Sequence, residues 1–354
     1  MDEEKKIEES ANTFLKSFFA ATYNDNKMLF DNMQNIYALI SFLYNNMQYL
    51  DVETQDLRTS TRKDYVAKSK LINDFYKNIG INFVMNDIER DGTLNILNTN
   101  TPSEATHNQI YFGNNNYVIT EEFYIDPKTK EKIITYRAFH KTINVYNNDL
   151  LTDSIIWVHE ISHYKNQPPE KRGEVNIILT ELIAYTEELI YTDYLSQIGY
   201  EEEARMFMIE EYKSLYNLIG LAYHVIKITF LYYLLGEVSK ESYKLLYKDE
   251  EEYEDSLKIF DEEKNKNQNI IFLMLHYSVA IISFYNYIEY KKDSNYLNKL
   301  KKLNKEIMTN ISLEDALKII DIKLNKKSLN KILENINIFR DSLIKENKKK
   351  KILN

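Results

Sequence analysis

The stretch Asp153–Leu195, DSIIWVHEISHYKNQPPEKRGEVNIILTELIAYTEELIYTDYL, determines how this chain is interpreted. At its centre is His159–His163, HEISH, which is an H-E-x-x-H motif. Residues four apart on a helix lie on the same face, so the two imidazoles can reach one ion together. Glu160 then lies beside that ion, which is where a general base for an activated water belongs.

The residues around the motif predict that it lies on a helix. Asp153 and Ser154 are suitable N-cap residues, and the double proline of Gln167-Pro168-Pro169 ends the helix. Apolar side chains for packing come from Ile155, Ile156, Val158 and Ile161. The alternative is an exposed helix that carries two solvated histidines, in a chain with six histidines in all.

A second helix is predicted from about Glu174 to Leu195. Glu174, Glu181 and Glu188 recur every seven residues and form one carboxylate stripe. A solvated acidic face is one interpretation of this stripe. However, an acidic side chain in an apolar segment is costly to bury unless it is paired or bound to a metal. The apolar residues around Glu181 are Ile177, Ile178, Leu179, Leu182, Ile183 and Ala184. We therefore expect Glu181 to be the third protein ligand of a zinc ion whose fourth position holds water.

These segments resemble the catalytic core of the thimet oligopeptidase/oligoendopeptidase F family of zinc metallopeptidases. The resemblance rests on HEISH, on Gln167-Pro168 and on TELIAYTEELIYTDYL. In that family the ligand Glu is followed by a small residue three positions on and another Glu seven positions on, as in Glu181, Ala184 and Glu188 here. The family usually has Ser at the position of Ala184 and favours Gly at that of Ser162. The loop between the two helices is also shorter here, which keeps Glu188 as an alternative third ligand.

The resemblance implies a mainly α fold with a small antiparallel β-sheet, organised as a zincin-like metallopeptidase catalytic domain with helical lobes around a cleft. It also implies an endopeptidase that cleaves short, unfolded peptides and binds one Zn²⁺ ion through His159, His163 and Glu181. Glu160 would take a proton from water as that water attacks the scissile carbonyl, and would pass the proton to the leaving amine.

Further site residues are expected from the same resemblance. The family has a His followed by closely spaced Tyr residues in this part of its chain, and His276 with Tyr285 and Tyr287 is similar. We expect His276 and one of these tyrosines to donate hydrogen bonds to the oxyanion of the tetrahedral intermediate. An aromatic core helix is the alternative interpretation of this segment. Asp153 and Glu188 are candidates for holding the imidazoles or the helices in register.

Composition narrows the class of protein. Only seven Gly and four Pro among 354 residues, with 28% charged and 44% hydrophobic residues, favour long helices. The absence of Cys excludes disulfides and any thiolate ligand or nucleophile. A net charge of -9 disfavours nucleic acid as a partner. The charged start MDEEKKIEES contains no apolar core of a secretory signal, so we expect a cytoplasmic location.

One uncharged run, Asn267–Ile288, is long enough to span a bilayer. It contains polar residues, namely His276, Ser278, Ser283 and Asn286. We therefore predict a buried core helix and no membrane partner.

The chain is expected to divide into an N-terminal helical segment (1–100), a catalytic domain with C-terminal helices (101–342) and a basic tail (343–354). We expect the end of this tail, ENKKKKILN, to be solvated and disordered. Residues 108–148 contain short β-rich runs, with a hairpin turn at Asp126-Pro127-Lys128 between strands at 122–125 and 132–138. An edge strand of this sheet would pair with the extended substrate backbone.

Two other functions remain open from the sequence. One is a zinc aminopeptidase-type hydrolase, whose site would have to capture a free N-terminal amine. The other is a non-catalytic helical interaction protein that retains a zinc site, although the presence of Glu160 argues against it.

Overall fold

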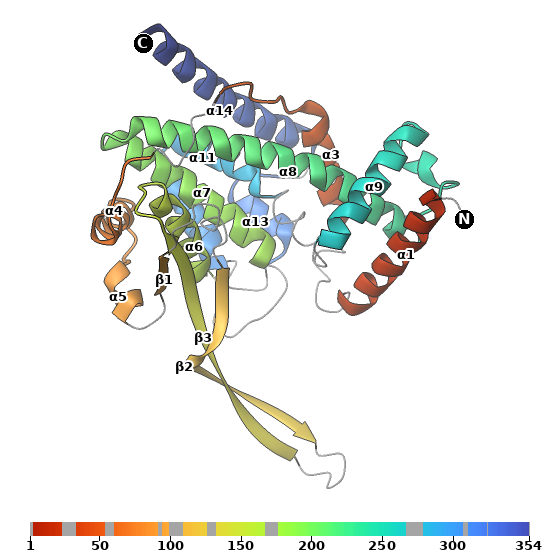
Figure 1. Cartoon of the computed structure of the whole chain (residues 1–354), viewed down its shortest axis with the longest axis horizontal. Helices are drawn as coiled ribbons and strands as arrows, with labels where there is room; N and C mark the ends of the chain where they lie inside the picture. Colours follow the sequence, from red (N-terminus) through yellow and green to blue (C-terminus); the bar gives the residue numbers. More distant parts are fainter. Residues whose placement is uncertain are drawn as a thin grey trace. The chain divides into compact units, whose positions relative to one another are not determined.

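The structure is a computed structural model that describes residues 3–22, 33–53, 60–90, 94–98, 109–125, 132–166, 176–266, 279–306, 311–323 and 325–353. Helices dominate these residues, as the composition predicts (Figure 1). The chain forms two compact units. One comprises Met1–Thr54, Gly173–Thr186 and Met208–Asn354, and the other comprises Gln55–Arg172 and Glu187–Phe207. Each unit is made of segments that are far apart in the sequence, whereas the domains expected from the sequence are consecutive. The expected domain boundaries stay a prediction.

The unit built around Gln55–Arg172 contains the H-E-x-x-H helix and the sheet. Its elements are α4 (Tyr65–Asn78), α5 (Met85–Arg90), β1 (Leu94–Asn98), β2 (Gln109–Ile125), β3 (Lys132–Asn147) and α6 (Asp153–Asn166). The last turns of α7 (Asn176–Gln197) and the first turns of α8 (Glu201–Leu235) complete it.

All regular elements among the described residues of the other unit are helices. Its elements are α1 (Glu3–Thr22), α3 (Met33–Asn46), the 3-10 helix η3 (Tyr243–Leu245), α9 (Glu250–Lys266), α11 (Ile282–Lys292), α12 (Tyr296–Glu306), α13 (Leu313–Ile319) and α14 (Lys326–Leu353), with the remaining turns of α7 and α8.

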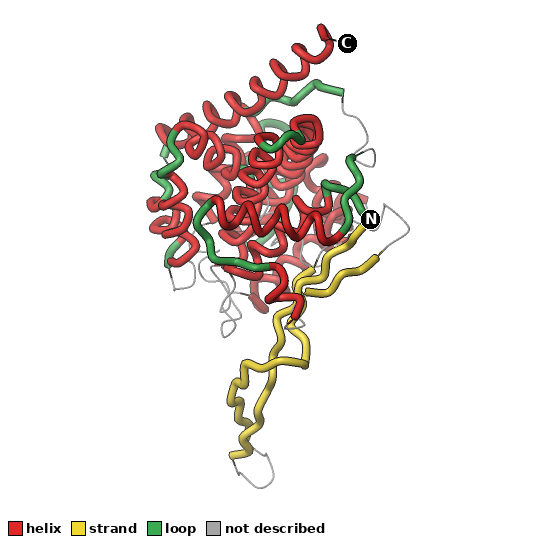
Figure 2. The backbone as a smooth tube through the Cα atoms, turned by 90° about the vertical axis from the view of Figure 1, so that its left-hand side faces the viewer, coloured by secondary structure: helices red, strands yellow, loops and turns green. Residues whose placement is uncertain are grey.

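The sheet has three strands in the order β1-β3-β2. Strand β2 pairs with β3 in antiparallel register from Gln109↔Asn144 to Ile125↔Lys132, with an irregularity between Gly113 and Val118. The expected hairpin is therefore present in much longer strands, which run side by side in Figure 2, while its predicted turn at Asp126-Pro127-Lys128 lies outside the described residues. The expectation of a purely antiparallel sheet is wrong for β1, because β1 pairs with β3 in parallel.

Helix α6 follows β3 directly and packs against β2, β3 and α4. Its first residue, Asp153, accepts hydrogen bonds from the backbone N–H groups of Asn148 at 2.9 Å and Leu150 at 3.1 Å. The same carboxylate pairs with the ammonium of Lys68 on α4 at 2.7 Å, and the Lys68 side chain is completely buried. Burial lowers the pKa of Lys68, whereas the hydrogen bond to Asp153 raises it. This buried pair fixes the start of α6 relative to α4 and the end of β3.

Aromatic packing holds the helices of the other unit together. The Phe284 ring on α11 stacks on Phe339 of α14 with centroids 4.5 Å apart, and Tyr212 of α8 lies 5.5 Å from Phe284. On α8, His224 forms a hydrogen bond through Nδ1 with Ser256 Oγ at 2.8 Å. That contact gives a hydrogen-bond partner to a histidine in an otherwise apolar stretch of α8.

One helix of the described residues, α8, is long and apolar enough to cross a membrane by length and composition alone. In its most apolar window 56% of the residues are buried in the protein, and a core helix passes the same test. At the other end of the chain, α14 continues to Leu353. The prediction of a disordered basic tail is therefore wrong, because the tail extends the last helix.

The Lys68–Asp153 pair gives a stability prediction with a control on the same helix. Replacing Lys68 by Met leaves a buried carboxylate without its counter-ion and should lower the free energy of unfolding by about 3–5 kcal/mol. The Lys70–Asp74 pair on α4 has side chains that are 74% and 44% exposed, so Lys70→Met should leave the free energy of unfolding nearly unchanged. Urea unfolding of both variants measures the difference, and equal losses would contradict the assigned role of the buried pair.

Candidate metal centre

Helix α6 brings the side chains of the two motif histidines together, with one ring edge-on to the other. Their Nε2 atoms are 3.1 Å apart, and their ring centroids are 4.8 Å apart at an interplanar angle of 77°. Both side chains are largely buried, since His163 is 7% exposed and the His159 side chain is 13% exposed. The i, i+4 spacing on one helical face produces this convergence, as the sequence predicts.

Helix α7 supplies a carboxylate to the other ring nitrogen of His159. Glu188 Oε2 lies 2.7 Å from His159 Nδ1, and the Glu188 side chain is 2% exposed. A carboxylate accepts, so the Nδ1–H of His159 donates and Nε2 keeps its lone pair. A ligand imidazole that donates its second N–H to a carboxylate is the usual arrangement around protein-bound zinc. Glu188 therefore contacts the ring nitrogen of His159 that a metal bound at Nε2 would leave free.

Glu181 lies two turns before Glu188 on the same continuous helix. His159, His163 and Glu181 each offer one ligand atom, and these atoms all lie within 4.8 Å of one another. The three residues form a group that could hold a metal ion.

The donor set fits zinc. Two nitrogen ligands at 2.0–2.1 Å from a tetrahedral ion are separated by about 3.3 Å. The observed 3.1 Å between the Nε2 atoms is close to that separation. Two imidazoles with one carboxylate is also a ligand set of catalytic zinc sites that keep one position open. His159, His163 and Glu181 would hold the ion, and Glu160, which is 8% exposed, follows the first ligand on α6.

A second acid–base pair joins α6 to α7 beside the histidines. Lys165 Nζ lies 2.7 Å from Glu187 Oε2, and the Tyr76 hydroxyl on α4 donates to the same oxygen at 3.2 Å. Burial lowers the pKa of Lys165, although the Glu187 carboxylate raises it. Burial, followed by the charge of Glu187, raises the pKa of Tyr76 well above its ordinary value.

Three predicted site residues remain, namely His276, Tyr285 and Tyr287. His276 lies outside the described residues. The Tyr285 hydroxyl accepts a hydrogen bond from Lys331 Nζ at 2.9 Å, and the Tyr287 ring packs edge-on against Phe339 at 5.6 Å. Both tyrosines therefore contact α14, and their role at an oxyanion stays a prediction. Asp153 holds the start of α6 to Lys68, so it supports the helix rather than an imidazole.

Sequence reasoning missed Lys165, Glu187 and Tyr76. The available signal was a lysine two residues after the second histidine, together with a Glu-Glu doublet in the apolar second helix. Pairing between these two segments depends on how the helices are offset along their axes, which the spacing of residues within each helix does not specify.

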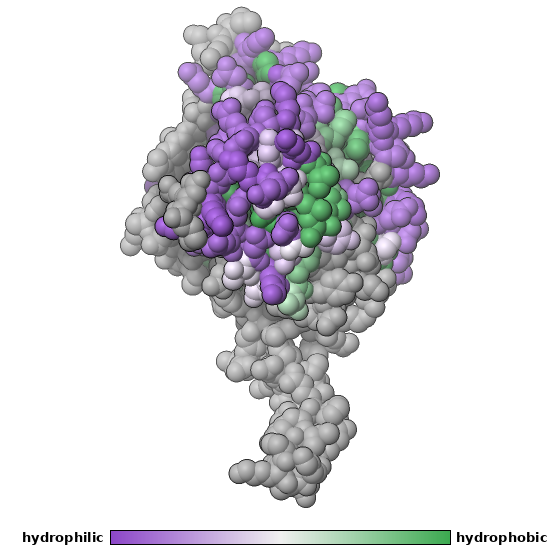
Figure 3. All heavy atoms as spheres, turned by 90° about the vertical axis from the view of Figure 1, so that its right-hand side faces the viewer, coloured by the Kyte–Doolittle hydropathy of each residue, from purple (hydrophilic) through white to green (hydrophobic). Residues whose placement is uncertain are grey.

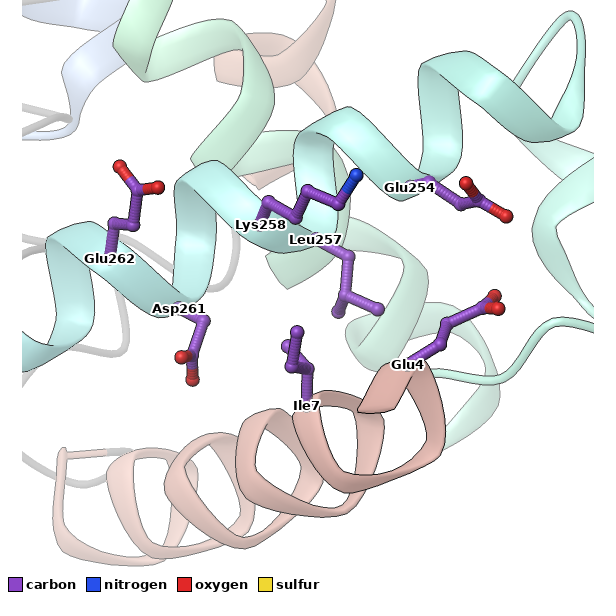
Figure 4. A pocket seen from close by; sticks show the side chains of 7 residues that line it. All are labelled: Glu4, Ile7, Glu254, Leu257, Lys258, Asp261 and Glu262. Atoms are coloured by element: carbon purple, nitrogen blue, oxygen red, sulfur yellow. The ribbon is translucent and has the colours of Figure 1, made fainter. Parts of the chain in front are cut away.

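A separate pocket lies between α1 and α9 (Figure 4) and has a volume of about 520 Å³. Its lining residues are Glu4, Ile7, Glu254, Leu257, Lys258, Asp261 and Glu262. The ammonium group of Lys240 lies 3.3 Å from a carboxylate oxygen of Glu4 and 3.7 Å from a carboxylate oxygen of Glu254. Two of the acidic side chains that line the pocket therefore have a positive charge nearby. On this side of the molecule the coloured residues are mostly hydrophilic, with a smaller hydrophobic patch among them (Figure 3). None of the predicted site residues that the structure describes lines this pocket, and we assign it no catalytic role.

The fold is similar to a crystal structure described as "putative oligoendopeptidase F" from Bacillus anthracis str. Ames, with a TM-score of 0.53 and 12% sequence identity. The match covers 96% of this chain and 62% of that one, so this chain spans about six tenths of the length of the protein it matches. No family model and no curated protein matches the sequence. The family resemblance is therefore supported at the level of the fold, together with a histidine–histidine–glutamate group that could hold a metal ion.

Substitution of Glu181 and of Glu188 on α7 should affect zinc binding to different extents. We expect Glu181→Gln to remove retained zinc, because a ligand is lost, and Glu188→Gln to weaken binding by about 10–100-fold, because only the support of His159 is lost. Metal content after dialysis and competition with a chromophoric chelator measure both effects. His224→Ala, a histidine in contact with Ser256, is the control and should bind zinc as the unmodified chain does. If Glu188→Gln lost more zinc affinity than Glu181→Gln, Glu188 would be the ligand instead.

Proposed function

We propose that this chain is a zinc-dependent peptidase that hydrolyses internal bonds of short peptides. The single observation that carries the proposal is the pair of Nε2 atoms 3.1 Å apart, one of them on an imidazole whose Nδ1 contacts a buried carboxylate at 2.7 Å. The i, i+4 spacing alone brings the two rings near each other, but a pair of solvated histidines on an exposed helix would not place one Nδ1 on a carboxylate that is 2% exposed. Imidazole ligands of a metal ion commonly have such a partner. The similarity in fold to a protein described as an oligoendopeptidase favours peptides as the substrate.

In the proposed mechanism His159, His163 and Glu181 hold the ion, and a bound zinc ion supplies Lewis-acid activation of water near neutral pH. Glu160 accepts the proton that the attacking water gives up and delivers it to the leaving amine. Glu188 keeps His159 in the tautomer that binds through Nε2. The low exposure of Glu160, 8%, limits competing water around the proton it carries.

Substitution of the proposed base separates metal binding from chemistry. Glu160→Gln keeps the size of the side chain and all three proposed ligands but loses the proton acceptor. The variant should retain one zinc ion per chain while peptide hydrolysis falls by about 10²–10⁴-fold. The assay is cleavage of a quenched fluorescent peptide, with zinc measured on the same sample and a chelator-treated sample as the inactive reference. Glu210→Gln, on α8, is a control that should keep full activity. Undiminished turnover by Glu160→Gln would refute the assigned role.

The same assay distinguishes the two alternative functions. An endopeptidase cleaves peptides whose N-terminus is blocked, whereas an aminopeptidase requires a free amine. If neither kind of peptide is cleaved by zinc-loaded protein, the chain is a non-catalytic zinc protein and the proposal fails.

A further inference from the structure

Two acid–base pairs join α6 to α7 at neighbouring positions of α7. His159 contacts Glu188 at 2.7 Å, and Lys165 contacts Glu187 at 2.7 Å. The partners on α7 are consecutive, whereas those on α6 are six residues apart, which is about 9 Å along a helix. Two contacts at different heights along α6 restrict both the sliding and the rotation of α6 against α7.

The lysine pair is enclosed by protein. The Lys165 and Glu187 side chains are 15% and 8% exposed. The fully buried Tyr76 covers them, with its ring centroid 4.1 Å from Lys165 Nζ and its hydroxyl 3.2 Å from Glu187 Oε2. Helix α4 therefore takes part in the contact together with α6 and α7.

Stability alone does not account for this arrangement. Desolvation of two charges cancels much of their attraction, so apolar residues of similar volume often replace a buried ion pair without loss. The best-attested use of such a pair is to select one arrangement among several. A choice of that kind exists here, because Glu187 and Glu188 are adjacent carboxylates about 100° apart around α7. A rotation of α7 by that angle would bring Glu187 in place of Glu188 to His159 and would turn Glu181 away.

We propose that Tyr76, Lys165 and Glu187 form a positioning clamp that holds Glu188 on His159 and thereby sets the metal affinity of the site. By holding Glu187, Lys165 prevents it from competing for the imidazole. All three are positioning residues, which act through Glu188 and His159. The inference rests on the proposed metal centre but not on the proposed peptidase activity, so its test measures metal binding and not turnover.

The decisive variant replaces the ion pair by apolar residues, Lys165→Met together with Glu187→Leu. The metal-free double variant should unfold at nearly the same urea concentration as the metal-free unmodified chain, because the buried pair contributes little net stability. Its zinc affinity, measured by chelator competition, should nevertheless fall by about 10–100-fold, the usual effect of disturbing the partners of a ligand. The visible absorption bands of bound Co²⁺ should also shift, since they report the ligand set directly.

A milder variant and a matched control complete the experiment. Tyr76→Phe keeps the packing and removes one hydrogen bond, so it should weaken zinc binding in the same direction by a smaller factor. The exposed pair on α4, changed to Lys70→Met with Asp74→Leu, should leave zinc affinity and the Co²⁺ spectrum unchanged.

The outcomes separate the clamp from the metal centre. If Tyr76→Phe and the double variant both keep the zinc affinity and the Co²⁺ spectrum of the unmodified chain, the clamp is refuted while the metal centre stands. If the unmodified chain binds neither ion, the metal centre itself fails and the clamp falls with it. Should the double variant not fold, the pair would be structural, and an unchanged Tyr76→Phe would then overturn the proposal.

Discussion

The hydrogen bond from His159 Nδ1 to the buried carboxylate of Glu188 is the contact on which the candidate site depends. It determines which nitrogen of the imidazole keeps a lone pair, and it aims that lone pair at the second histidine of the motif. A bond to an ionised partner at 2% exposure is stronger than the same bond in water, so the ring has little freedom to turn away. The contact also ties α6 to α7, which is the helix that carries the third candidate ligand.

Helix α6 is held by charged contacts along its whole length. Asp153 meets Lys68 at its first residue, Lys165 meets Glu187 in its last turn, and the histidine–glutamate contact lies between them. Each of these pairs is costly to desolvate and contributes modestly to stability, but together they define the orientation of a 14-residue helix. A donor set fixed in this way before metal arrives loses less freedom when an ion binds, which is the general advantage of a preorganised site.

The sequence predicts the parts of the site that depend on spacing within one helix. The i, i+4 positions of His159 and His163 suffice to place both imidazoles on one face, and low Gly and Pro content suffices for a mainly helical fold. Contacts between residues on different helices cannot be predicted from spacing within one helix. Glu181 and Glu188 share a face of α7, so spacing alone leaves either of them as the ligand, and only the offset between the two helices assigns Glu188 to His159.

Contacts between segments far apart in sequence, or the context of a segment in its helix, also explain where the structure differs from the other predictions. The parallel pairing of β1 with β3 joins strands far apart in sequence, and local turn signals carry no information about it. The basic tail is helical because α14 is already established when the chain reaches it, and propagation of a helix is easier than its nucleation. Tyr285 and Tyr287 follow a family pattern in sequence, but their contacts are determined by the packing of α11 against α14.

X-ray absorption at the zinc edge of the purified, zinc-loaded chain tests the central claim most directly. The account predicts one zinc ion with four nitrogen and oxygen ligands at about 2.0–2.2 Å and the multiple-scattering signature of two imidazoles. A spectrum with six oxygen ligands and no imidazole scattering, or a chain that retains no zinc after dialysis, would contradict it.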